Sequence, residues 1–244
     1  MSHASGRFDT THWSLVVAAG GEDTSAARHG LAALCEAYWF PLYAYVRRHG
    51  YGSEDARDLT QSFFARFIER KDAGAARKER GRFRSFLLAS MKHFILNDVD
   101  SRRALKRGGG HAHVSIEFEG AEDRYGREPA DTRTPEAIYE RQWALTVLDR
   151  TLRKLRENAR LAGKEAEFAA LTPYLTPEGG TAAYGDVGRL LGQSEGAVRV
   201  AVHRLRRRYK RLLRKEIAAT VADGDADDEL RYLIAVLGRP DSRL

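Results

Sequence analysis

The chain is poor in cysteine, proline and long apolar runs, and each shortage excludes a class of protein. It has 244 residues and one cysteine, Cys35, which excludes an internal disulfide framework and a cysteine-rich zinc site. Its prolines number six, and the alternation of apolar and polar residues typical of strands is nearly absent. The apolar stretch 13–19 is too short for a signal-peptide core or a membrane span. We therefore expect a soluble cytoplasmic protein that has no contact with a membrane.

Motifs that support catalysis or bind cofactors are also missing. The chain has no phosphate-binding Walker loop, no G-x-S-x-G or H-E-x-x-H motif and no paired-carboxylate arrangement. His111 and His113 stand two residues apart without a partner cluster, which is a weak signal for a metal site. Cys35 lies on an apolar helical stripe, as expected for a buried structural thiol. These patterns predict a protein that is not an enzyme and has no catalytic residues, cofactor or metal.

Charge is distributed in blocks along the chain. The net charge is +7 and the isoelectric point is about 9.6. Residues 1–110 carry +6 and residues 136–218 carry +7, whereas 111–135 and 219–244 each carry −3. Two basic blocks separated by an acidic segment are typical of a protein that binds a polyanion such as nucleic acid. A surplus of arginine on solvated helix faces would give the same totals.

Apolar residues recur at helical spacing almost throughout the chain, which predicts an all-α fold. Helices are expected over 31–49, 53–70, 82–106, 135–160, 165–174, 181–191 and 195–219. The polar, acidic stretch before Pro135 indicates a flexible linker. The predicted organisation is two helical domains, 1–110 and 136–219, joined by an acidic linker, 111–135, and followed by an acidic and amphipathic C-terminal tail, 220–244.

The segment 184–209 has the layout of a helix-turn-helix. Val187, Leu190 and Leu191 are expected to face inward from its first helix, and Val198, Val202 and Leu205 from its second. Gly192 supplies the tight turn and Ser194 caps the second helix. Residues 199–215 include nine basic residues and no acidic one, so the second helix is predicted to bind DNA. The predicted contacts are Ser194, Glu195, Ala197, Val198, Arg199, His203, Arg204, Arg206 and Arg207. Helix pairs joined by a glycine turn also occur in proteins that never bind DNA.

This segment resembles region four of bacterial RNA polymerase sigma factors, in the extracytoplasmic-function (ECF) group of the sigma-70 family. The similar features are the Leu-Gly turn, the run Ser-Glu-Gly-Ala-Val that begins at Ser194, and the run His-Arg-Leu-Arg-Arg-Arg that begins at His203. The resemblance implies that this domain reads the −35 promoter element. The family usually has alanine where this chain has Gly188, and glycine in a helix costs about 0.5–1 kcal/mol relative to alanine. The first helix is therefore expected to be weakened there.

The N-terminal half carries a second resemblance to the same family. Its run Ala-Arg-Asp-Leu-Thr-Gln-Ser-Phe-Phe, residues 56–64, is similar to the region-two segment that binds the β′ clamp helices of core polymerase. The resemblance implies core-polymerase contacts by Asp58, Leu59, Gln61, Phe64, Arg66 and Phe67. The alternative is that the phenylalanines belong to the core of the domain.

Residues 81–107 resemble the part of region two that binds the −10 element and its non-template strand. The residues that this resemblance assigns to the DNA are Lys92, His93, Asn97, Arg102, Arg103, Lys106 and Arg107. Many family members have Arg-Asn where this chain has Lys92-His93, so a base preference is not carried over.

The resemblance covers residues 11–218 and implies a sigma factor that directs transcription initiation. The implied partners are core RNA polymerase, through its β′ clamp helices and β flap, and promoter DNA as duplex and as non-template single strand. An anti-sigma factor is a further partner that the resemblance allows. The alternatives are a helix-turn-helix regulator that does not associate with core polymerase and, more distantly, a helical protein-interaction module. The tail either docks a short helix on the second domain or shields the basic residues 199–215 with its acidic run, 223–229.

Overall fold

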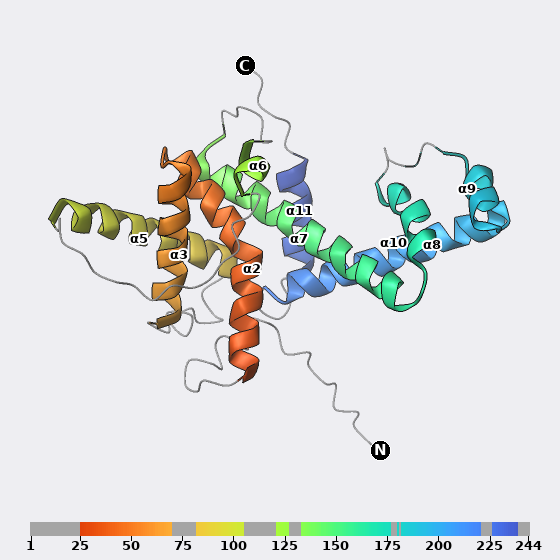
Figure 1. Ribbon diagram of the computed structural model, residues 1–244, viewed down its shortest axis with the longest axis horizontal. Coiled ribbons are helices and arrows are strands. Elements are labelled where there is room, and N and C mark those ends of the chain that lie inside the picture. The colour runs from red at the N-terminus through yellow and green to blue at the C-terminus, as the bar shows by residue number, and fades with distance from the viewer. Residues whose placement is uncertain are drawn as a thin grey trace. The chain divides into compact units, whose positions relative to one another are not determined.

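The computed structural model describes residues 25–69, 82–104, 121–126, 133–176, 180, 182–220 and 226–238, and all regular secondary structure in these ranges is helical (Figure 1). The helices are α2 (Ser25–Arg48), α3 (Ser53–Glu69), α5 (Phe83–Ala104), α6 (Ala121–Gly126), α7 (Pro135–Leu161), α8 (Glu165–Leu171), the 3-10 turn η2 (Thr172–Leu175), α9 (Tyr184–Leu191), α10 (Glu195–Ala218) and α11 (Ala226–Leu237). The all-α prediction is confirmed for this part of the chain. None of these helices has the length and apolar character needed to cross a membrane.

Local sequence signals explain where several of these helices begin. The hydroxyl of Thr134 accepts a hydrogen bond from the amide of Ala137 at 3.3 Å, and Pro135 occupies the first helical position of α7. Helix α9 begins at Tyr184, three residues later than expected, because Ala183 has an extended backbone conformation. The remaining predicted helix ends in 133–220 agree with the structure to within a few residues.

The chain forms two compact units whose limits differ from the predicted domains. Unit 1 contains residues 1–146 and 217–244, and unit 2 contains residues 147–216. The chain therefore leaves unit 1 within α7 and re-enters it within α10, so unit 2 is an insertion into unit 1. The sequence did not reveal this division, because α7 and α10 cross the unit limits without a break in their apolar spacing.

Part of the segment predicted as a flexible linker packs on unit 1. Helix α6 lies within 111–135, and its Ala121 is buried. The Glu122 carboxylate accepts hydrogen bonds from the Tyr43 hydroxyl and from Arg47 Nε, the latter at 2.9 Å. The Arg47 guanidinium also lies 4.9 Å from the centroid of the Tyr125 ring. Residues 121–126 are therefore held against α2, which corrects the linker prediction for this stretch.

The described part of unit 1 has an aromatic core built by three helices that contact one another, α2, α3 and α5. Ring centroids lie 5.2 Å apart for Tyr38 and Phe83, and 5.6 Å apart for Phe63 and Phe94. Aromatic pairs at such separations add about 0.5–1.5 kcal/mol beyond the burial of their surfaces. This packing fixes which face of α3 and of α5 remains at the surface.

The C-terminal helix α11 belongs to unit 1, which corrects the prediction that the tail docks on the second domain and removes Glu229 from the predicted shield. Leu233 and Val236 are buried, and the Glu229 carboxylate pairs with Arg84 and with Arg82, 2.7 Å from Arg82 Nε. Glu229 is therefore not available to shield residues 199–215, and α11 is grouped with unit 1 rather than with the second domain. Asp223 and Asp225, also part of the predicted shield, lie outside the described residues.

Candidate nucleic-acid interface

The turn between α9 and α10 has the geometry that the sequence predicts. Gly192 adopts a left-handed backbone with φ of +64° and ends α9. The amide of Gln193 then donates a hydrogen bond to the carbonyl oxygen of Gly188 at 2.8 Å. The Ser194 hydroxyl accepts a hydrogen bond from the amide of Ala197 at 3.2 Å, which caps the start of α10. The helix-turn-helix is thus closed by bonds at both ends of the turn.

Gly188 is required by the close approach of the turn to α9. A Cβ atom at this position would lie 2.6 Å from the carbonyl oxygen of Gln193. The obstructing atom belongs to the backbone of the turn, so no side-chain movement relieves the contact. The expectation that glycine weakens this helix relative to alanine is therefore reversed at this site.

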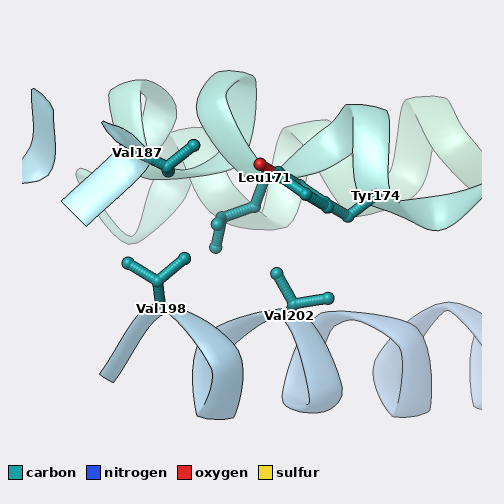
Figure 2. Close-up of a cluster of buried hydrophobic side chains, with 5 residues drawn as sticks. All are labelled: Leu171, Tyr174, Val187, Val198 and Val202. Atoms are coloured by element: carbon teal, nitrogen blue, oxygen red, sulfur yellow. The ribbon is translucent and has the colours of Figure 1, made fainter. Parts of the chain in front are cut away.

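A small apolar core fixes the rotation of α10. Figure 2 shows Val198 and Val202 of α10 pointing toward Leu171, Tyr174 and Val187, and all five side chains are buried. Further along α10, Leu205, Tyr209 and Leu212 pack against a second buried cluster formed by Leu155, Ala159 and Phe168. The sequence prediction that Val198, Val202 and Leu205 face inward is confirmed.

Two predictions within the helix-turn-helix are wrong, namely the DNA contact of Val198 and the inward position of Leu190. Val198, predicted among the DNA contacts, has no exposed surface because it sits at the centre of the apolar core. Leu190, predicted to face inward, is 76% exposed because the core takes only the Val187 and Leu191 side of α9. Val198 is therefore a core residue and Leu190 a surface residue.

One flank of α10 presents Arg199, His203 and Arg206 at the surface. Arg199 forms an ion pair with Glu195 at 2.9 Å, and its guanidinium lies 5.8 Å from the centroid of the Tyr184 ring. Arg206 Nε donates a hydrogen bond to the carbonyl oxygen of Tyr174 at 2.8 Å. Ser194, Glu195 and Ala197 are exposed at the start of the same helix. The structure thus brings together the first-turn residues and this basic flank.

The other flank of α10 borders a groove of about 420 Å³ inside unit 2. Its floor is apolar and includes Leu155, Phe168 and Leu205. Its rim is strongly basic and is formed by Lys164, Arg204, Arg207, Arg208 and Arg211, with Glu167 as the acidic member. Arg204 and Arg207 were predicted as DNA contacts, but the sequence reasoning did not identify the groove. The spacing of Arg204, Arg208 and Arg211 by four and three residues was the available signal for a separate face.

The residues predicted to bind the −10 element are described only in part. Lys92 pairs with Glu136 at 2.7 Å, and this hydrogen bond holds the pKa of Glu136 below its usual value. His93 and Asn97 are exposed and line a shallow groove with Phe63, Arg66 and Phe94. Arg102 and Arg103 lie on α5 but their side chains are outside the described residues, as are Lys106 and Arg107 altogether.

Three of the six residues predicted to bind core polymerase are buried in unit 1. Leu59, Phe64 and Phe67 belong to the core, because α3 packs against both α2 and α5. A residue with almost no exposed surface in a well-packed core cannot supply contact area to a partner without rearrangement. Asp58 remains exposed, and Gln61 and Arg66 are half-buried. Of the six residues predicted to bind core polymerase, these three have side chains at the surface of α3.

Elsewhere in the described ranges, no group of three or more His, Cys, Asp or Glu side chains is arranged to hold a metal ion. His111 and His113 lie outside these ranges. Cys35 is buried, and its burial raises the pKa of the thiol from 9.0 to about 12. The thiol is therefore protonated near neutral pH.

The fold and the interface define an all-helical protein that carries a helix-turn-helix with a basic outer surface in unit 2. Comparison of the chain with protein-family models, with curated proteins and with solved structures finds no match.

Proposed function

We propose that this protein is a sigma factor, which binds core RNA polymerase and directs it to promoters. The observation that carries the proposal is the construction of α10. A serine cap and an apolar core hold this helix so that its first turn and a flank with Arg199, His203 and Arg206 face solvent. This is the arrangement that a recognition helix needs in order to enter the major groove of duplex DNA.

The −35 element is assigned to this flank of α10. The amide groups in the first turn of a helix favour a DNA phosphate, and side chains in the first two turns reach base edges. Arg199 is placed for a base contact, and it would exchange its exposed ion pair with Glu195 for that contact. Such exposed pairs are worth about 0.3–0.5 kcal/mol on a helix, so the exchange is inexpensive.

Core polymerase is assigned to two surfaces. On α3, Asp58, Gln61 and Arg66 form the contact with the β′ clamp helices that the resemblance implies. In unit 2, the groove with an apolar floor and a basic rim is suited to an amphipathic segment that carries acidic side chains. We assign the β-flap contact to this groove, which leaves the Arg199 flank of α10 for DNA.

The −10 element is assigned to α5. His93 and Asn97 are exposed polar side chains that line a groove with Phe63 and Phe94, and Lys92 on the same helix would exchange its pair with Glu136 for the strand. Positive charge and aromatic surface together are what unstacked bases of a single strand require. The aromatic residues are mostly covered by their neighbours, so the bases are expected to lie against the polar side chains.

A helix-turn-helix regulator that acts without core polymerase is the second candidate. The burial of Leu59, Phe64 and Phe67 favours it, because it removes the apolar half of the expected polymerase contact. The helix-turn-helix itself is equally suited to either protein. Only the behaviour toward core polymerase separates the two.

Transcription in vitro separates the two candidates. The full chain is mixed with a bacterial core RNA polymerase and a pool of DNA with randomised upstream windows, and the RNA 5′ ends are sequenced. A sigma factor gives defined start sites that require both proteins and share two upstream sequence elements. Selection of one duplex sequence by the chain alone, with no transcripts when core is added, would identify the regulator.

A matched pair of variants tests the assignment of α10 in the same assay. Arg199→Ala should relax the preference at the upstream element. Arg153→Ala should leave it unchanged, because Arg153 is an exposed arginine in a similar ion pair, with Asp149 at 3.1 Å, on α7. Equal effects of the two substitutions would contradict the assignment of this flank to DNA.

A further inference from the structure

A carboxylate from the C-terminal helix is buried at the start of α5. Glu229 of α11 is 1% exposed and lies between Arg82 and Arg84, its oxygen 2.7 Å from Arg82 Nε. Residues 84 and 229 are separated by 145 positions in the chain. A buried charge is tolerated only when it is paired and hydrogen-bonded, so the two arginines and Glu229 depend on one another.

Arg84 of α5 contacts both α11 and α7. Its guanidinium lies 4.0 Å from the ring centroid of Tyr232 on α11 and 5.2 Å from that of Trp143 on α7, and Nη1 lies 3.3 Å from Glu140. Its backbone oxygen accepts a hydrogen bond from the Tyr139 hydroxyl at 2.9 Å. Burial opposes the charge of Arg84, but the hydrogen bond and negative charge of Glu229 raise its pKa above the usual value. The guanidinium is therefore permanently charged and cannot leave Glu229 without a large cost.

The start of α5 is linked by the rigid helix to the side chains assigned to the −10 element. Arg84 lies at the second position of α5, and His93 follows nine residues later on the same helix. At 1.5 Å per residue this is about 14 Å, or two and a half turns. A change in the tilt or rotation of α5 at Arg84 is therefore carried to Lys92, His93 and Asn97.

We propose that Glu229 is a positioning residue for the −10 contact: it fixes the start of α5 through Arg82 and Arg84 and so sets how α5 presents Lys92, His93 and Asn97. The inference rests on the proposed function for the identity of the DNA contact. The C-terminal helix α11 thereby acts on α5, far from it in the sequence. Helix α11 lies beyond residue 218, where the resemblance to the family ends.

Hydrogen exchange of the full-length protein tests the positioning without any DNA. In Glu229→Gln, amides of 86–97 should exchange about ten-fold faster than in the unsubstituted protein, whereas those of 184–205 in unit 2 should not change. Asp228→Asn is the matched control, because Asp228 is an exposed carboxylate on the same helix that pairs locally with Arg231. Unchanged protection of α5 in Glu229→Gln would overturn the proposal. If that variant does not fold, Arg82→Gln removes one of the two partners and should give a smaller increase confined to α5.

Binding of single-stranded DNA by the holoenzyme then tests whether this positioning serves the −10 contact. Oligonucleotides with the −10 sequence found by the transcription assay are titrated at a temperature where circular dichroism shows each variant folded. Glu229→Gln should weaken binding about ten-fold and Asp228→Asn should not, while both keep the −35 duplex affinity of the unsubstituted protein. Equal single-strand affinity of Glu229→Gln and the unsubstituted protein would overturn the proposal. Failure of the unsubstituted holoenzyme to bind would instead refute the proposed function of α5.

Discussion

Substitution of Gly188 by alanine should destabilise the helix-turn-helix, although helix propensity alone predicts the opposite. An added methyl group in a helix favours folding by about 0.5–1 kcal/mol over glycine. Here the new Cβ would lie 2.6 Å from the carbonyl oxygen of Gln193, whose own amide is bonded to Gly188. Overpacking of this kind costs about 1–3 kcal/mol, so the middle of the two ranges gives a net loss of about 1 kcal/mol.

Hydrogen exchange of peptides that cover 184–202 measures this loss as a decrease in the free energy of local opening. The matched control is Gly196→Ala in the first turn of α10, where a Cβ would meet nothing within 4 Å. That substitution should stabilise the same region by about 0.5–1 kcal/mol. The reasoning is refuted if Gly188→Ala is as stable as the unsubstituted protein or more stable, because the turn would then be more open than the structure shows.

Three further predictions concern Val198, Arg199 and Glu136. Val198→Thr should destabilise unit 2 by about 1–3 kcal/mol, because it buries a hydroxyl in the apolar core. Val200→Thr, at a position 48% exposed, should change the free energy of unfolding little, and equal effects in a urea titration would contradict the placement of Val198. Arg199→Ala should reduce discrimination at one base pair of the upstream element by about 1–3 kcal/mol. Arg208→Ala should leave that discrimination unchanged, because Arg208 lines the groove assigned to the β flap. Competition binding with single-base variants measures both, and uniform weakening of all sequences by Arg199→Ala would argue against a base contact. The hydrogen bond from Lys92 lowers the pKa of Glu136 from its usual 4.5, so the pair stabilises the fold above that pH and loses its contribution as the pH falls through the folded-state pKa. The difference in unfolding free energy between the unsubstituted protein and Glu136→Gln should therefore shrink between about pH 6 and pH 3. A constant difference would show that the pair does not form.

Local signals in the sequence were sufficient to predict the turn and most of the helices, but not α6, which lies in the stretch predicted as a linker. Gly192, Ser194 and Thr134 have short-range roles, a left-handed turn and two caps, and each role depends only on a few neighbouring residues. The inward positions of α10 were also predictable, because a helix of this length allows one apolar stripe. In the eight-residue α9 the stripe is too short to fix the rotation, and Leu190 was placed on the wrong side.

Long-range contacts were not predictable from the sequence alone. An apolar residue on α3 serves either a core or a partner surface, and only the presence of both α2 and α5 shows that Leu59, Phe64 and Phe67 are core. The pairing of Arg84 with Glu229 joins residues far apart in the chain and leaves no periodic signal. The need for glycine at position 188 likewise depends on where the turn returns to α9.

Co-elution with core polymerase tests whether this protein is a sigma factor. The full chain and a bacterial core RNA polymerase are mixed without DNA and separated by size-exclusion chromatography, with a mixture containing the Asp58→Ala/Arg66→Ala variant run in parallel. A sigma factor should elute with core, and the variant, altered at the exposed Asp58 and the half-buried Arg66 of α3, should shift toward the free protein. The proposal is contradicted if the unsubstituted chain elutes entirely apart from core while the same preparation still selects a specific DNA duplex.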